Sequence, residues 1–190
     1  MTVLNVPNFL TLLRLVAIPI FLILLGDHRW AAALGVFVAA GVTDALDGAI
    51  ARLTHTKTTL GAYLDPAADK LLLLSAFISL ALQNQVPSWL TVVVISRDVV
   101  VVLGYFLLFT MTQETIEVRP TAVGKLSTFF QLLAVTLVLV GLVRPAVVSD
   151  RIEEWVFYLA GLLTTAAGMQ YVYRGLAWLQ ARGGGAAPVT

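Results

Sequence analysis

The chain has 190 residues, of which 59% are hydrophobic and 12% charged, and its mean hydropathy is +0.91. This composition excludes an ordinary soluble domain and indicates that the membrane is the solvent. A net charge of +1 argues against a nucleic-acid partner, and the lack of cysteine excludes disulfides, thiolate metal ligands and a thiol nucleophile.

Six hydrophobic stretches follow one another along the chain, separated by turns rich in Gly, Pro, Asp, Asn or charge. Their lengths suit the roughly 18 or more residues that cross about 30 Å of hydrocarbon. They cover residues 8–26, 30–52, 60–84, 88–111, 122–144 and 152–180. We therefore predict an all-α polytopic membrane protein with six transmembrane helices. One membrane domain would occupy residues 1–182, and residues 183–190 would form a disordered tail.

The distribution of basic residues predicts the orientation. The first stretch carries Arg14 and no small-residue cleavage site follows it, so we expect a retained helix rather than a signal peptide. With six spans both termini lie on one side, where six basic residues gather against three on the other. The six are Arg52, Lys57, Arg119, Lys125, Arg174 and Arg182. The positive-inside rule then places the termini in the cytoplasm.

Four aspartates interrupt the second and third stretches, at Asp44, Asp47, Asp65 and Asp69. A carboxylate costs roughly 2.5–3.5 kcal/mol at mid-bilayer, so these side chains must face protein or water. A short connection makes the two helices antiparallel neighbours. Their paired acids would supply the hard oxygen ligands that Mg²⁺, Mn²⁺ or Ca²⁺ prefers, which predicts a site for two divalent cations.

Helical spacing gathers small and basic residues around these acids. In one helix, five residues fall on a single stripe: Asp44, Asp47, Gly48, Ala51 and Arg52. A second stripe repeats every four residues at Gly61, Asp65 and Asp69, provided that the next helix already includes Gly61. Simpler roles stay open for single residues. Asp65 could cap a helix before Pro66, and Asp47 with Arg52, or Asp69 with Lys70, could be interfacial charges.

The two stripes together resemble the full signature of the CDP-alcohol phosphatidyltransferase family, and the resemblance extends over residues 5–176. It implies a six-helix membrane fold, commonly dimeric, whose site opens to the cytoplasm. It also implies that the four aspartates bind two divalent cations, Mg²⁺ or Mn²⁺, and that Asp69 is the general base. The pocket for the CDP group would be lined by Gly48, Ala51, Arg52 and Gly61.

Basic residues outside the signature bear on the acceptor alcohol. Arg97 and Lys125 cannot comfortably face lipid, and a phosphate pocket beside the metals would use them. Alternatively, Arg97 pairs internally with an aspartate and Lys125 reaches the interface. Together with Arg14 and Arg119, they are our candidates for binding the acceptor's phosphate.

Within the family, the chain resembles the eukaryotic-type cardiolipin synthases, through segments that include residues 5–14, 64–70, 95–99 and 119–121. Phosphatidylglycerophosphate synthases, which use glycerol-3-phosphate, are the alternative. They typically have Glu after the fourth-helix arginine and a second arginine eight residues on, where this chain has Asp98 and Tyr105. We therefore favour phosphatidylglycerol as acceptor of the phosphatidyl group from CDP-diacylglycerol.

Two further expectations concern the setting and a different class of function. The lack of an Arg-rich leader favours a bacterial inner membrane, with the active site facing the cytoplasm. Intramembrane acids could instead belong to a cation transporter. Arg52 and the paired glycines suit a nucleotide diphosphate better than a transported ion.

Overall fold

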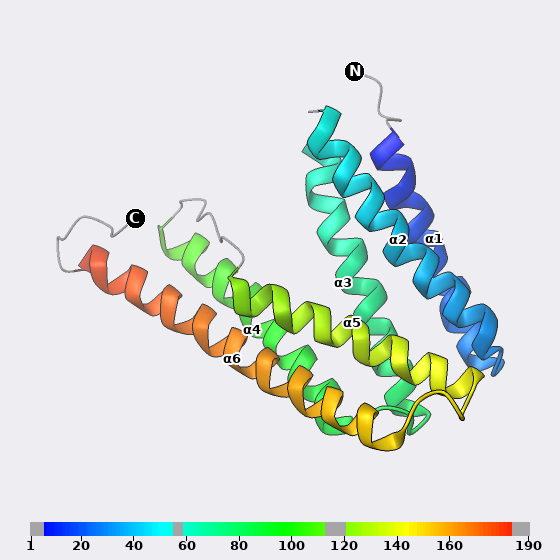
Figure 1. Cartoon of the computed structure of the whole chain (residues 1–190). Coiled ribbons are helices and arrows are strands. Elements are labelled where there is room, and N and C mark those ends of the chain that lie inside the picture. The colour runs from blue at the N-terminus through cyan, green and yellow to red at the C-terminus, as the bar shows by residue number, and fades with distance from the viewer. Residues whose placement is uncertain (1–5, 55–58, 113–120, 184–190) are drawn as a thin grey trace. The chain divides into compact units, whose positions relative to one another are not determined.

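The computed structural model describes residues 6–54, 59–112 and 121–183, and within them the chain forms six α-helices and no strand (Figure 1). The helices are α1 (Val6–Gly26), α2 (Trp30–Thr54), α3 (Thr59–Leu82), α4 (Ser88–Thr112), α5 (Ala122–Val143) and α6 (Asp150–Gly183). Each begins and ends within three residues of a predicted stretch. The all-α prediction is therefore confirmed for the described residues. The predicted tail lies outside them, apart from Gly183.

Two helices in the described part of the chain are long and apolar enough to cross a membrane. These segments are Ser88–Thr110 in α4 and Ala122–Val143 in α5. Two shorter apolar segments are Thr11–Gly26 and Trp30–Asp44. Val102, Leu103 and Phe106 on α4 are each at least 60% exposed, and lipid is the solvent that suits such a surface. Six helices are thus confirmed, whereas six membrane crossings stay a prediction.

Two helix ends are fixed by backbone conformation. His28 and Asn84 follow α1 and α3 with positive φ angles of 56° and 58°. The next residue after each donates its N–H to the carbonyl five residues earlier: Arg29 to Leu24 at 2.8 Å, and Gln85 to Leu80 at 2.9 Å. This is the Schellman arrangement, which satisfies carbonyls that the helix end leaves free. It stops α3 at Leu82, although the apolar sequence predicted continuation to residue 84.

The chain divides into two compact units, and each is described by itself. The first comprises residues 1–87 and 132–153, and the second comprises residues 88–131 and 154–190. In the first unit α1 packs against both α2 and α3 (Figure 1). The rings of Phe21 and Phe37 lie 5.6 Å apart in this contact. Because α1 touches both of the helices that carry the predicted acidic stripes, its polar residues can reach them.

In the second unit, α4 and the first part of α5, residues 122–131, both contact α6. The Trp89 ring of α4 stacks on Tyr158 of α6 at 5.7 Å and lies against Gly161. Gln131 of α5 donates a buried hydrogen bond of 2.8 Å to the Thr164 hydroxyl of α6. Small residues and interhelical hydrogen bonds are typical of helix packing in membranes, where apolar contact alone does not favour protein over lipid.

Candidate active site

Two of the four predicted metal ligands meet at one arginine in the first unit. Arg14 of α1 binds Asp44 of α2 through Nη2 at 3.0 Å and Asp69 of α3 through Nη1 at 2.9 Å. The Arg14 side chain is only 1% exposed, whereas those of Asp44 and Asp69 are 39% and 42% exposed. Carboxylates from two different helices therefore converge within reach of a single guanidinium group.

The carboxylates of Asp44 and Asp69 offer oxygen atoms of the kind that a divalent cation requires. Hard cations take carboxylate oxygens from more than one element, and Asp44 and Asp69 present them from neighbouring helices. Their partial exposure leaves each carboxylate accessible from solvent. Arg14 offsets part of their mutual repulsion, which otherwise disfavours two acids in one place. The donor chemistry of these residues fits Mg²⁺ or Mn²⁺.

The helices also position the backbones of the other signature residues. Asp47 follows Asp44 by about one turn within α2, and Asp65 precedes Asp69 by about one turn within α3. Because α3 begins at Thr59, it includes Gly61, as the second stripe requires. Gly48, Ala51 and Arg52 lie within α2. The side chains of these residues are outside the described part of the structure, so their assigned roles stay predictions.

The predicted acceptor residues fall in different places. Arg14 belongs to the acidic cluster just described, and its role toward an acceptor stays a prediction. Arg97 and Lys125 belong to the second unit, where Lys125 is exposed in the first turn of α5. Arg119 lies outside the described residues. Thr121, just before α5, caps this helix, since its hydroxyl accepts a hydrogen bond of 2.9 Å from the N–H of Gly124.

Arg97 is the most constrained of these cations. Its side chain is 9% exposed, and its Nη1 forms a short ion pair with the carboxylate of Asp98. The guanidinium carbon also lies 5.3 Å from the centre of the Tyr171 ring of α6, within the range of a cation–π contact. The internal pairing that the sequence left open for Arg97 is therefore present. Tyr171 was not predicted, because no spacing rule connects α4 to a residue 74 positions later.

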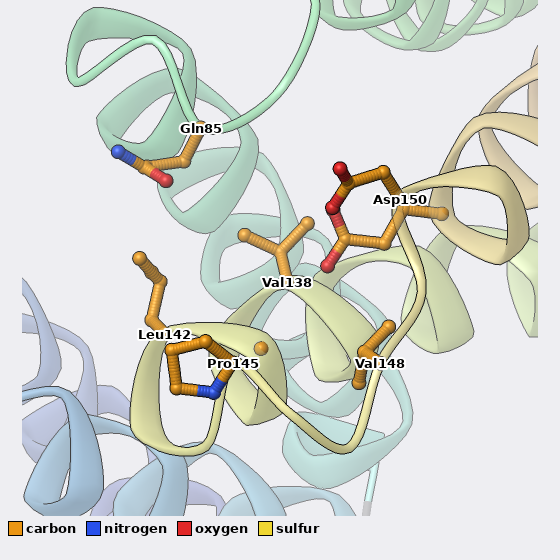
Figure 2. A pocket seen from close by; sticks show the side chains of 8 residues that line it. Gln85, Val138, Leu142, Pro145, Val148 and Asp150 are labelled. Atoms are coloured by element: carbon orange, nitrogen blue, oxygen red, sulfur yellow. The ribbon is translucent and has the colours of Figure 1, made fainter.

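A separate pocket lies where α5 meets α6, with a volume of about 170 Å³ (Figure 2). Gln85, Val138, Leu142 and Asp150 are among the residues around it. Asp69 lies 13 residues before the end of α3, which corresponds to about 20 Å along that helix. The pocket adjoins this far end through Gln85, so it is distinct from the acidic cluster.

Comparison with known proteins decides the family. The sequence model of the CDP-alcohol phosphatidyltransferases matches residues 4–166. The chain belongs to the CDP-alcohol phosphatidyltransferase family. Both acidic stripes lie inside the matched segment, and Tyr171 lies beyond it. The predicted family is thus confirmed, and the chain is a transferase of phospholipid synthesis rather than a cation transporter.

Relatives within this family differ in the acceptor that their names imply. The chain is 38% identical to a probable phosphatidylglycerophosphate synthase of Mycobacterium tuberculosis, over 90% of this chain and 82% of the relative. It is 34% identical to the cardiolipin synthase (CMP-forming) of Rattus norvegicus, over 89% of this chain and 60% of the relative. It is 32% identical to the CDP-diacylglycerol–glycerol-3-phosphate 3-phosphatidyltransferase of Bacillus subtilis, over 88% of this chain and 93% of the relative. Membership therefore fixes the class of transfer but not the acceptor.

Proposed function

We propose that this CDP-alcohol phosphatidyltransferase uses phosphatidylglycerol as acceptor and CDP-diacylglycerol as donor, giving cardiolipin and CMP. The terminal glycerol hydroxyl of phosphatidylglycerol forms a new bond to the phosphatidyl phosphorus of the donor. The bond from that phosphorus to the CMP oxygen breaks, and CMP leaves. Asp69 accepts the proton of the attacking hydroxyl.

Residues of the signature would hold the donor. Asp44, Asp47, Asp65 and Asp69 would bind two divalent cations, which when bound neutralise charge on the diphosphate and on departing CMP. Arg52 offers a planar fork of N–H donors to diphosphate oxygens. Gly48, Ala51 and Gly61 leave room for the nucleotide, because none carries a bulky side chain. The meeting of Asp44 and Asp69 at Arg14 supports this arrangement.

The observation that favours phosphatidylglycerol is the ion pair of Arg97 with Asp98. An arginine that already shares its charge with a carboxylate attracts a second anion less strongly. Such a partly neutralised site suits the single negative charge of a phosphodiester better than the dianionic phosphate of glycerol-3-phosphate. Tyr105 on α4, where rival enzymes typically carry another arginine, adds no positive charge.

A second candidate is phosphatidylglycerophosphate synthase, which is favoured by the 38% identity to the mycobacterial relative of that name. Both candidates share the donor and the acidic stripes, and they differ only in the attacking alcohol. An acceptor assay therefore distinguishes them without altering any residue.

The test uses purified protein with CDP-diacylglycerol and Mg²⁺ or Mn²⁺, offered phosphatidylglycerol or glycerol-3-phosphate in separate reactions. We expect CMP release and cardiolipin, identified by mass, with phosphatidylglycerol. Phosphatidylglycerophosphate formed only from glycerol-3-phosphate would establish the second candidate.

We further propose that the enzyme is a homodimer in a bacterial inner membrane, with its active site facing the cytoplasm. Family members are integral membrane proteins, and the two apolar helices α4 and α5 agree with such a setting. Chemical cross-linking in membranes before extraction, followed by mass measurement, tests the dimer. A monomer only, at every cross-linker concentration, would contradict it.

A further inference from the structure

Arg97 of α4 is enclosed by residues of two other helices in the second unit. Tyr171 and Gly168 of α6 lie against it, and so does Gly124 of α5. The Nε of Arg97 is buried and makes no hydrogen bond to any residue that the structure describes. Only one carboxylate, that of Asp98, pairs with this guanidinium among the described residues. A buried arginine therefore has donor capacity that its own pairing does not use.

The two glycines make the room that the arginine occupies. A β-carbon at Gly168 would lie 3.3 Å from Cγ of Arg97, tighter than ordinary contact. A β-carbon at Gly124 would lie 3.4 Å from the Tyr171 hydroxyl and 3.8 Å from Nη2 of Arg97. The cap from Thr121 fixes the first turn of α5, and with it the position of Gly124. The position of Arg97 is thus determined by packing on both sides.

A guanidinium held against an aromatic face presents its donors in a fixed plane. Such a fork matches the oxygens of a phosphate, and it binds them at lower entropic cost when its own position is already fixed. An unused buried N–H is costly unless an acceptor reaches it. Both observations indicate that an anion with several oxygens completes the pairing of Arg97.

We propose that Tyr171 is a positioning residue, which together with Gly168 holds Arg97 for the phosphate of the acceptor. This makes α6 part of the acceptor site, although the sequence assigned it no role there. The inference rests on the proposed function only in that a phosphate-bearing acceptor is used. It applies equally to phosphatidylglycerol and to glycerol-3-phosphate.

The test compares Tyr171→Leu, which removes the ring, with Tyr171→Phe, which keeps it. Initial rates of CMP release are measured at varied acceptor, then at varied CDP-diacylglycerol, using whichever of the two acceptors the wild type accepts. We expect Tyr171→Leu to raise the acceptor KM about tenfold, the loss typical of a partly buried cation–π contact. The KM of Tyr171→Leu for CDP-diacylglycerol should change by less than about twofold. Tyr171→Phe should have the acceptor KM of the wild type.

Gly168→Ala provides a second perturbation from the same helix, with Gly175→Ala as its matched control. The added methyl at position 168 presses on the side-chain carbons of Arg97. At position 175 the nearest described atom is a carbon of Leu108 at an ordinary 3.5 Å. We expect Gly168→Ala to raise the acceptor KM and Gly175→Ala to leave both KM values unchanged. If Tyr171→Leu does not fold, as judged by thermal unfolding in detergent, the acceptor KM values of Gly168→Ala and Gly175→Ala test the proposal.

The outcomes separate two kinds of failure. If the wild type releases no CMP with either acceptor, the proposed function fails. If the wild type is active but Tyr171→Leu and Gly168→Ala leave the acceptor KM unchanged, the positioning role fails. A proportional rise of both KM values, or a fall in kcat alone, would indicate a purely structural role and would also overturn the proposal.

Discussion

At the scale of the residue, Arg14 carries a full charge with 1% of its side chain exposed. A buried arginine is tolerated only when paired, and here Asp44 and Asp69 both pair with it. The sequence identified all three residues as functional. It did not predict that they bind one another, because a one-dimensional pattern contains no information on which acid an arginine from a third helix will meet. The role that the sequence predicts for Arg14 toward the acceptor's phosphate stays a prediction.

Replacing Asp44 or Asp69 tests the acidic cluster directly. Asp44→Asn and Asp69→Asn should each lower CMP release by at least about a hundredfold, because an amide cannot neutralise a divalent cation. The same expectation holds for Asp65→Asn. In these variants the increase in melting temperature that Mn²⁺ causes in detergent should also disappear. Asp27→Asn should keep both the CMP release and the Mn²⁺-dependent increase. Near-normal turnover by a purified variant would disprove the metal assignment.

Replacing Arg14 tests its structural contribution. Arg14→Met should lower the free energy of unfolding by about 2 kcal/mol, less than for a fully buried pair because both carboxylates are partly exposed. The free energy of unfolding of Arg14→Lys should lie between those of the wild type and Arg14→Met, since an ammonium lacks the planar fork that binds two acids at once. Unfolding in detergent measures both, and exposed Arg29→Met serves as control. An unchanged melting temperature with a raised acceptor KM would instead favour the acceptor role.

At the scale of the element, the sequence predicted helices well because hydrophobic runs and polar turns alternate along the chain. It placed the end of α3 two residues too late, since the left-handed conformation of Asn84 depends on the terminal hydrogen bonds. It also missed Tyr171 and Gly168 as neighbours of Arg97. Their contacts arise from the packing of α4 against α6, which spacing within a single helix cannot reveal.

The contact of α4 with α6 predicts the effect of a single methyl group. A β-carbon at Gly161 would lie 2.5 Å from Cζ3 of Trp89, whose ring is rigid and stacked on Tyr158. Gly161→Ala should therefore destabilise the protein by about 1–3 kcal/mol, as overpacking typically does. At Gly104 on α4 an added methyl meets no described atom within 4 Å. Gly104→Ala should not lower the melting temperature, and equal melting of both variants would contradict the contact.

At the scale of the whole molecule, composition identified the membrane and the acidic signature identified the family. The acceptor could not be read in the same way, because relatives bearing either name have similar identity to this chain. The basic residues that would choose between them lie outside the signature. Their chemistry depends on partners such as Asp98 and Tyr171, which only the folded chain reveals.

The orientation can be tested with single cysteines, because the chain has none of its own. A cysteine at Thr190 should react with a membrane-impermeant maleimide only after the cytoplasmic face is opened. A cysteine at Ser149, between α5 and α6, should react in intact cells. This pattern follows from an even number of crossings and from the excess of basic residues beside the termini. Reaction of both positions from the same side would refute it.

The pairing of Arg14 also constrains how the protein is made. Asp69 follows Arg14 by 55 residues, so at about 5–20 residues per second the ribosome needs roughly 3–11 s to supply the second carboxylate. During that interval Asp44 of α2 is the only one of the two carboxylates that can pair with the guanidinium of α1. If α1 crosses the membrane as the sequence predicts, its arginine is fully paired only after α3 has been made.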